Sequence, residues 1–260
     1  MSTDIQLSQN LINFNVKENI MIQKINKNTK QKSNNKLRVG GLFAGIGGIE
    51  LGFKKAGFEI AWANEIDKNA AITYRMNHQH KLFEKDLKEL RTDEVEQIDI
   101  LTGGFPCQAF SVAGHRKGFQ DNRGNVFFEI LRFLDDLEPK VLFLENVKNL
   151  KGHDGGRTFK TVINKLENRG YHLKYKVLNS SEYANVPQNR ERIYIVCFKN
   201  QYIGDNEFEF PNVKSIKSPI KDYLDKDYQD FQVYDERFKH YDLLKNTINS
   251  TKTIYQWRRK

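Results

Sequence analysis

Residues 37–65 read LRVGGLFAGIGGIELGFKKAGFEIAWANE, and this stretch decides the fold. It opens with an apolar run from Leu37 to Phe43, which predicts a buried strand. A helical stretch from Ile49 to Ala56 follows, and a second apolar run covers Phe58 to Ala63. A strand, a helix and a second strand in this order predict parallel strands joined by a helix.

The same alternation continues outward and predicts an α/β fold, in which a parallel sheet carries helices on both faces. Further strands are expected at 98–102, 141–144, 171–177 and 193–198, and further helices at 69–76, 125–137 and 159–166. Pro139 is expected to end the helix at 125–137, because proline cannot continue a helix.

Three segments are expected along the chain. Residues 1–36 are rich in asparagine, glutamine and lysine and predict a polar, weakly ordered leader. Residues 37–211 carry the strand and helix pattern of one good-sized domain. Residues 212–260 lose that periodicity, which predicts the start of an incomplete second domain.

Composition excludes several classes of protein. Two cysteines ninety positions apart suit neither a disulfide framework nor a zinc site, so we expect no metal and a reducing, cytoplasmic location. No apolar run approaches the ~20 residues that span a bilayer, so no membrane partner is expected. The net charge of +9 favours a polyanionic partner, although part of that charge belongs to the leader.

A glycine-rich turn, FAGIGG at 43–48, joins the first strand to the first helix and predicts a ligand site. Glu65 ends the second strand, about 20 residues after the turn, where an acidic side chain binds the ribose of a nucleoside cofactor. The pattern is neither Gly-x-Gly-x-x-Gly nor Gly-Lys-Ser/Thr, so a nucleoside without a pyrophosphate fits better. Asp86 suits either the adenine amino group or a helix N-cap, and Glu65 could instead be a solvated carboxylate.

Cys107 follows Gly104-Phe105-Pro106 and precedes Gln108, at the corner between a strand and a loop. The thiolate is the reactive form of cysteine, so Cys107 needs electropositive neighbours in order to act as a nucleophile. The alternative is a small buried hydrophobic residue. That alternative is the expectation for Cys197, which lies inside an apolar run.

Two polar segments could complete a site around Cys107. Glu145-Asn146-Val147 follows one apolar run, and Gln188 to Arg192 precedes another. Ligand and catalytic groups gather at the carboxyl ends of parallel strands, and Cys107 and Glu145 both fit that rule. The arginines precede their strand and are expected to reach the crevice from a loop.

The turn at 43–48, Gly104 to Gln108, Glu145-Asn146-Val147 and Gln188-x-Arg190-x-Arg192 together resemble the cytosine-5 DNA methyltransferases of bacterial restriction-modification systems. The match covers residues 37–198 in the order and spacing of that family. The resemblance implies a Rossmann-like S-adenosylmethionine-dependent methyltransferase sheet with helices on both faces, plus an incomplete small domain.

The resemblance also implies catalytic roles. Cys107 would attack C6 of a cytosine flipped out of double-stranded DNA, so that C5 takes the methyl group of S-adenosylmethionine. Glu145 would hold N3 and the exocyclic amine of the base. Arg192 would bind the cytosine O2, and Arg190 would support Glu145 and the cysteine loop.

Cofactor and DNA contacts follow from the same resemblance. The residues implied to bind S-adenosylmethionine are Phe43, Gly45, Gly47, Gly48, Glu65, Ile66, Asp86 and Pro106. Ile66 stands where some members carry a tryptophan against the adenine, which predicts weaker stacking. The residues implied to contact DNA are Gln108, Ser111, Arg116, Lys117 and Arg123, in a basic stretch resembling the family's mobile loop. The alternative for that stretch is a solvated loop.

The target-recognition region and last two motifs of the family have no counterpart here, and the stretch Tyr255 to Lys260 resembles the approach to the first of those motifs. A split enzyme completed by a second polypeptide, a truncated gene product and an expressed fragment all fit this pattern. Two other functions stay open: an inactive remnant that binds DNA or a partner, and a transfer RNA cytosine-5 methyltransferase.

Overall fold

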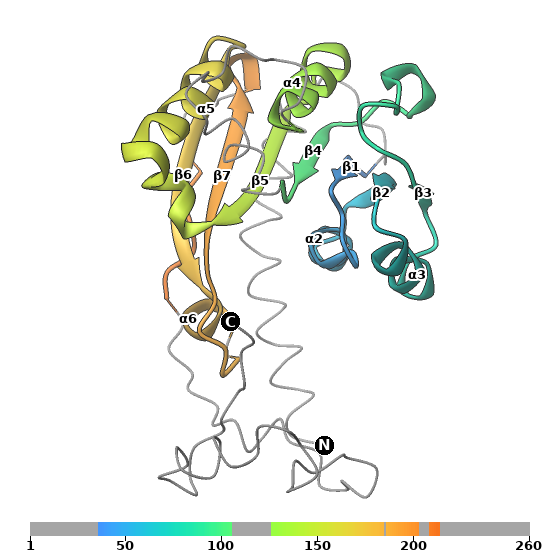
Figure 1. Ribbon diagram of the computed structural model, residues 1–260, viewed down its shortest axis with the longest axis horizontal. Coiled ribbons are helices and arrows are strands. Elements are labelled where there is room, and N and C mark those ends of the chain that lie inside the picture. The colour runs from blue at the N-terminus through green and yellow to red at the C-terminus, as the bar shows by residue number, and fades with distance from the viewer. Residues whose placement is uncertain (1–35, 106–125, 185, 203–207, 214–260) are drawn as a thin grey trace, which may run out of the picture. The chain divides into compact units, whose positions relative to one another are not determined.

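The computed structural model describes residues 36–105, 126–184, 186–202 and 208–213 (Figure 1). All of them belong to the first of the two compact units into which the chain divides, Met1–Lys217 and Ser218–Lys260. Within the described ranges, no helix is long and apolar enough to cross a membrane.

A seven-stranded sheet with the order β3-β2-β1-β4-β5-β7-β6 forms the centre of this unit. The strands are β1 (Arg38–Leu42), β2 (Glu59–Asn64), β3 (Lys81–Phe83), β4 (Ile100–Gly103), β5 (Val141–Val147), β6 (Tyr171–Asn179) and β7 (Glu191–Lys199). The α-helices are α2 (Gly48–Lys55), α3 (Lys68–Asn77), α4 (Val126–Leu137), α5 (Arg157–Glu167) and α6 (Ser180–Tyr183). Short 3₁₀ helices are η1 (Thr92–Glu94), η5 (Lys148–Lys151), η6 (His153–Gly156) and η7 (Asn200–Tyr202).

Side chains on the central strands alternate between two apolar layers, as the period of a strand requires. Val141 joins one buried cluster, which also contacts Phe53 of α2, whereas Leu142 joins the larger cluster formed with α4 and α5. Figure 1 shows α2 and α3 grouped on one side of the sheet and α4 and α5 on the other. The expected α/β sheet with helices on both faces is therefore confirmed.

Strands β3, β2, β1, β4 and β5 pair in parallel, whereas β7 lies antiparallel to both β5 and β6. The expectation of a parallel sheet was thus wrong for the last pairings. The cause lies in the connection between β6 and β7. It holds only α6 and a short loop, and parallel neighbours need a crossover of a dozen or more residues.

Several element boundaries also differ from expectation. Strand β5 continues to Val147, and β7 begins at Glu191, so the polar motifs at these positions lie within strands. The short strand β3 and the 3₁₀ helices have no periodic signal and were not expected. Helix α4 ends at Leu137, two residues before Pro139, and Cys197 is completely buried, as expected.

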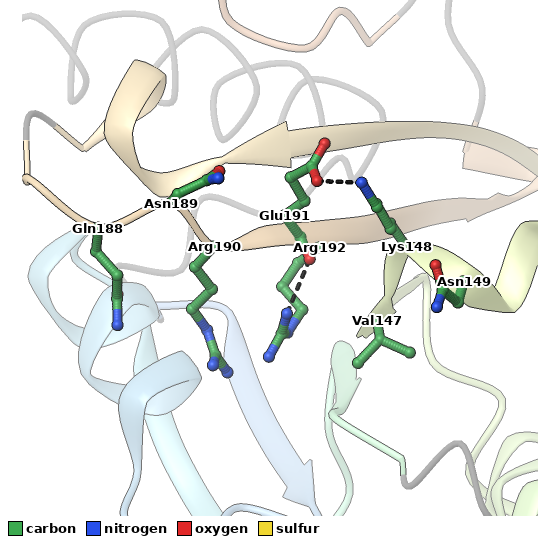
Figure 2. A pocket seen from close by; sticks show the side chains of 8 residues that line it. All are labelled: Val147, Lys148, Asn149, Gln188, Asn189, Arg190, Glu191 and Arg192. Atoms are coloured by element: carbon green, nitrogen blue, oxygen red, sulfur yellow. Dashed lines mark hydrogen bonds and ion pairs between the residues drawn. The ribbon is translucent and has the colours of Figure 1, made fainter. Parts of the chain in front are cut away.

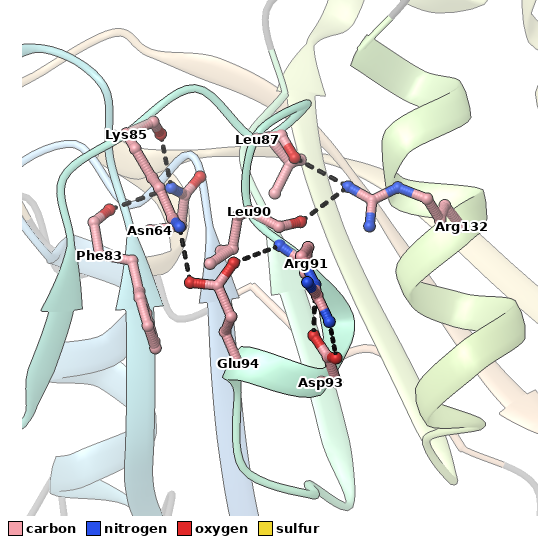
Figure 3. A network of polar contacts seen from close by, with 9 residues as sticks. All are labelled: Asn64, Phe83, Lys85, Leu87, Leu90, Arg91, Asp93, Glu94 and Arg132. Carbon is pink, nitrogen blue, oxygen red and sulfur yellow. Dashed lines mark hydrogen bonds and ion pairs between the residues drawn. The ribbon is translucent and has the colours of Figure 1, made fainter.

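A polar network fixes the segment that follows β3 (Figure 3). The Asn64 amide donates hydrogen bonds to the carbonyl oxygens of Phe83, at 3.0 Å, and Lys85, at 2.8 Å. From the other side, Arg132 of α4 donates to the carbonyl oxygens of Leu87 and Leu90. This segment includes Asp86, so the network positions a residue expected to contact cofactor.

Trp62 anchors the middle of β2 and limits its neighbour on β1. The indole is completely buried and donates a 2.8 Å hydrogen bond to the carbonyl oxygen of Glu96. A Cβ atom built on Gly40 would lie 2.4 Å from Cζ2 of Trp62. Glycine at position 40 therefore leaves the space that the indole fills.

We predict that Gly40→Ala destabilises the protein by about 1–3 kcal/mol, because a fixed, buried indole opposes the added methyl group. Gly52→Ala is the matched control, since position 52 lies inside α2 and a Cβ there would meet no heavy atom within 4 Å. This change should raise the free energy of unfolding by roughly 0.5–1 kcal/mol. Urea unfolding measures both values, and equal losses in the two variants would contradict the packing argument.

Candidate active site

The register of three parallel strands brings three segments of the expected site together. Leu42 of β1 pairs with Gly103 of β4, and Gly103 pairs with Leu144 of β5. The next residues along these strands are Phe43, Gly104 and Glu145. A Cβ atom built on Gly104 would lie 3.5 Å from Oε2 of Glu145 and 3.9 Å from the carbonyl oxygen of Phe43. The glycine-rich turn, the segment leading to Cys107 and Glu145 therefore meet at Gly104.

The glycine-rich turn has free space beside Gly45 and Gly48 and is closely packed beside Gly47. Phe43, Gly45 and Gly47 all have positive φ, at 55°, 58° and 91°. A Cβ on Gly45 or Gly48 would meet no heavy atom within 4 Å, whereas one on Gly47 would lie 2.1 Å from Nε2 of His78. Gly47 is the N-cap of α2 and supplies no side-chain hydrogen bond there, so the open face presents amide groups that suit an anionic ligand group.

Glu65 connects the turn to the end of β2. Its side chain is 8% exposed and accepts a 2.6 Å hydrogen bond from the N–H of Gly45. Its other oxygen accepts from the N–H groups of Ile66 and Asp67, at 2.9 and 2.8 Å. The structure thus brings Glu65 to the turn and leaves Ile66 58% exposed beside it. Their contacts with a cofactor stay a prediction.

Asp86 begins a turn after β3. Its Oδ1 atom accepts a 2.9 Å hydrogen bond from the N–H of Lys88, and its carbonyl oxygen accepts from Glu89 and Leu90. The alternative of a helix N-cap was therefore wrong, because Asp86 opens a turn and no helix begins at this position. A contact between Asp86 and adenine stays a prediction.

Glu145 pairs with Arg192 at the end of β5. Oε1 of Glu145 lies 2.9 Å from Nε of Arg192, and both side chains are 21% exposed. Burial raises the pKa of Glu145 above its usual value of 4.5, while the charges of Arg192 and Arg190 oppose that rise. The direct contact thus comes from Arg192, whereas the resemblance had assigned support of Glu145 to Arg190.

A pocket of about 370 Å³ opens beside this pair (Figure 2). Figure 2 shows Gln188, Arg190 and Arg192 projecting to the same side, while Glu191 points the other way and pairs with Lys148. The pocket is lined by Val147, Lys148, Asn149, Gln188, Asn189, Arg190, Glu191 and Arg192. It is therefore rich in cations and amides on the side that carries Arg190.

The antiparallel direction of β7 explains why the arginines lie here. Arg192 pairs with Val147 at the carboxyl end of β5, because β7 begins where β5 ends. Arg192 therefore reaches the site from a strand, and the expectation of a loop was wrong for this residue. Arg190 does lie in the preceding loop, where its N–H donates a 3.1 Å hydrogen bond to Oδ1 of Asn179.

Asn146 positions the segment that leads to Cys107, a role that was not expected for it. Its side chain is 3% exposed and donates a 2.9 Å hydrogen bond to the carbonyl oxygen of Phe105, two residues before Cys107. Its Oδ1 accepts from the N–H of Val147. An amide at the end of an apolar run was the available signal, because buried polar groups are kept where they have partners.

The remaining site residues expected from the sequence lie outside the described residues. These are Pro106, Cys107, Gln108, Ser111, Arg116, Lys117 and Arg123. Among the residues that are described, no group of three or more histidine, cysteine, aspartate or glutamate side chains could hold a metal ion.

Fold and site together define a Rossmann-like α/β protein with a glycine-rich turn next to a half-buried pair of a carboxylate and an arginine. Residues 37–260 match the family model described as C-5 cytosine-specific DNA methylase. The chain belongs to this family, whose members are enzymes.

Individual relatives agree with the family. The chain is 50% identical over 229 residues to the type II methyltransferase M.Bsp6I of Bacillus sp. (strain RFL6), covering 86% of this chain and 72% of that protein. It is 43% identical over 195 residues to M.HhaI of Haemophilus parahaemolyticus, covering 75% of this chain and 59% of that protein. The crystal structure of the S. pombe Dnmt2 methyltransferase is similar, with 25% identity and a TM-score of 0.59, over 74% of this chain and 62% of that one.

We predict that Arg192→Gln makes stability more dependent on pH. Glu145 has a raised pKa in the folded state, so its contribution to stability falls as pH rises from about 4.5 through that raised pKa. Without Arg192 the pKa of Glu145 rises further, and the fall becomes larger. Urea unfolding at a series of pH values measures the change.

The control for this experiment is Arg169→Gln, which removes an ion pair with the half-exposed Asp135. Such surface pairs contribute little, so its pH dependence should match that of the unchanged protein. Adding Glu145→Gln to Arg192→Gln should remove the extra fall. An Arg192→Gln protein with unaltered pH dependence would show that the pair does not control the pKa of Glu145.

Proposed function

We propose that this chain transfers a methyl group from S-adenosylmethionine to C5 of a cytosine in a specific double-stranded DNA sequence, as part of a restriction-modification system. The observation that carries the proposal is the meeting at Gly104 of the glycine-rich turn, the segment before Cys107, and Glu145. A methyl transfer to cytosine needs a cofactor, a nucleophile and a base-binding acid at one place. The membership of the chain in the C-5 cytosine-specific DNA methylase family supports the same reaction.

The described residues fit S-adenosylmethionine at the turn. The open N–H groups at the start of α2 suit the cofactor's carboxylate, and the space above Gly45 and Gly48 leaves room for it. Phe43 and Ile66 offer apolar surface to the adenine, Glu65 a carboxylate to the ribose, and Asp86 an acceptor to the adenine amine. We assign Pro106 to the same pocket. When bound, the cofactor supplies an electrophilic methyl group.

Glu145 suits the Watson–Crick edge of a flipped cytosine. Its raised pKa favours a carboxyl group that shares a proton with N3 while its other oxygen accepts from the exocyclic amine. Arg192 holds the carboxylate in place and presents its guanidinium near the pocket, where we assign it to the cytosine O2. Arg190 adds positive charge to the same pocket.

Cys107 is assigned as the nucleophile. Its thiolate adds to C6 of the base, and the electron pair that this addition releases makes C5 nucleophilic towards the methyl group. The C5 proton then leaves to a base, the C6–S bond breaks, and the thiolate is restored. Asn146 contributes by holding the carbonyl group of Phe105, which fixes the strand end from which the cysteine segment departs.

DNA contacts are assigned to the segment that follows the nucleophile, namely Gln108, Ser111, Arg116, Lys117 and Arg123. Phosphate contacts by its cations would make DNA affinity fall steeply with salt. The chain spans 59% of M.HhaI and 62% of the S. pombe structure. We also propose that a second polypeptide is a partner in the full activity.

We predict that Cys107→Ser abolishes transfer of labelled methyl groups to DNA, because a hydroxyl is a far weaker nucleophile than a thiolate. Cys197→Ala is the matched control. Cys197 is completely buried in β7, and burial raises the pKa of its thiol, so it has no part in the reaction. This control should keep the transfer rate. Equal transfer by Cys107→Ser and the unchanged chain would refute the assignment of the nucleophile.

We expect label to enter unmethylated double-stranded DNA and not transfer RNA. The assay compares the chain alone with the chain mixed with a polypeptide carrying the C-terminal segments of a relative such as M.Bsp6I. At least a tenfold gain in the mixture is expected if those segments contribute to transition-state binding, as each tenfold corresponds to about 1.4 kcal/mol. Label in transfer RNA would reassign the substrate. No label in either nucleic acid, with the chain alone or in the mixture, would favour a non-catalytic protein.

A further inference from the structure

Glu50 is a buried acid that the reaction described above does not use. It lies in the first turn of α2, two residues after the glycine-rich turn, and is 1% exposed. A Cβ atom built on Gly41 of β1 would lie 2.1 Å from its Oε1 atom, so the carboxyl group lies against the strand that leads into the turn. Among the residues that the structure describes, its Oε2 atom has no hydrogen-bond partner.

The groups around Glu50 do little to neutralise a negative charge. The hydroxyl group of Thr102 on β4 donates to the carbonyl oxygen of Gly40, and it and the N–H of Glu50 only partly offset the effect of burial on the carboxyl group. Glu65, at the end of β2, adds a like charge. Tyr74 of α3 is completely buried, and its pKa is raised by burial and by the charge of Glu50. The described surroundings thus contain two carboxylates and no cation in contact with Glu50.

The histidines beside α3 do not supply that cation at neutral pH. Burial lowers the pKa of His78, and it lowers the pKa of His80 to about 4. His80 lies against the hydroxyl group of Tyr74, and the His78 ring stacks on the Tyr74 ring at 4.3 Å between centroids. Both rings are therefore neutral where Glu50 titrates. Burial, with a smaller contribution from Glu65, raises the pKa of Glu50 to about 7.

Stability does not explain an acid in this position. A buried carboxylate without a cation costs free energy that an isosteric amide would avoid. Buried acids whose titration is strongly perturbed cluster at functional sites, where their charge can act on a ligand. The Glu50 carboxyl group lies against Gly41, and the glycine-rich turn begins two residues after Gly41. The electric field of Glu50 therefore acts where the cofactor is expected to bind.

We propose that Glu50 is a specificity-determining residue that makes the site favour a cationic cofactor over its neutral product, an inference that rests on the proposed function. S-adenosylmethionine carries a sulfonium charge, which the transfer of the methyl group removes to leave a neutral thioether. The ammonium and carboxylate groups of the two molecules are the same. An ionised Glu50 therefore stabilises the complex with the cofactor and not the complex with the product.

This role couples cofactor binding to a proton. Because the sulfonium charge favours ionised Glu50, binding of S-adenosylmethionine lowers the pKa of Glu50 and releases a proton near neutral pH. Binding of the thioether product releases less. The affinity for S-adenosylmethionine divided by the affinity for the thioether product therefore rises as pH increases, because more of Glu50 is ionised before the ligand binds.

Calorimetric titration of the full chain with S-adenosylmethionine and with S-adenosylhomocysteine tests the proposal. Between about pH 6 and about pH 8.5, the ratio of the two affinities should rise roughly threefold to tenfold in the unchanged chain. In Glu50→Gln the ratio should stay constant with pH. Glu167→Gln changes an exposed glutamate at the end of α5 and should behave like the unchanged chain.

Unfolding of the ligand-free protein shows whether Glu50→Gln folds. The native pKa of about 7 lies above the usual 4.5, so the stability of the unchanged chain should fall as pH rises between these values. Glu50→Gln should lose the part of that fall that Glu50 contributes, while the part from Glu145 remains, and it should be the more stable protein above pH 7. A folded Glu50→Gln protein that keeps the pH-dependent ratio would overturn the proposal.

The outcomes separate this inference from the proposed function. Binding of both ligands with a ratio that is independent of pH in the unchanged chain would overturn the role of Glu50 alone. Failure of both ligands to bind the folded chain would overturn the proposed function, and the role of Glu50 with it. A rising ratio that Glu50→Gln abolishes supports both.

Discussion

The parallel register of β1, β4 and β5 is the constraint on which the site depends. Because Leu42, Gly103 and Leu144 lie side by side, the residues that follow them leave the sheet at one edge. Three segments distant in the sequence thereby become neighbours, and the hydrogen bond from the Asn146 amide to the carbonyl oxygen of Phe105 joins two of them directly. A slip of one residue in either pairing would turn Glu145 to the other face of the sheet, since successive side chains on a strand alternate.

The antiparallel strand β7 adds Arg192 to the edge of the sheet where the parallel strands place Glu145. A parallel strand delivers its carboxyl end to the site, whereas an antiparallel strand delivers its amino end. Arg192, the second residue of β7, can therefore lie against Glu145 near the end of β5. This arrangement gives the half-buried carboxylate a counter-charge from a residue whose backbone is fixed in the sheet.

The sequence was sufficient for features that depend on local periodicity. Alternating apolar runs located the strands other than β3. Glu65 was expected in one site with the glycine-rich turn, and it does lie against that turn, although through a hydrogen bond to Gly45 that was not predicted. Features set by tertiary packing could not be predicted from local periodicity. The direction of β7 depends on the path of a short connection, and the burial of Glu50 depends on how α2 rotates on the sheet. That rotation buries Glu50 and leaves the neighbouring Leu51 42% exposed, against the preference of both residue types.

Three glutamates near this edge show how the same side chain acquires different properties. Glu65 receives three backbone N–H groups, and Glu145 receives a guanidinium, so each has partners that suit a charged carboxylate. Glu50 leaves one oxygen without a partner and is the most deeply buried of the three. A charge placed there is stabilised by whatever cation arrives in the neighbouring site, because water is excluded and no described protein cation contacts it. Exclusion of water and the lack of a contacting cation among the described residues therefore explain both why burying Glu50 costs free energy and why its ionised form responds to the charge of a ligand.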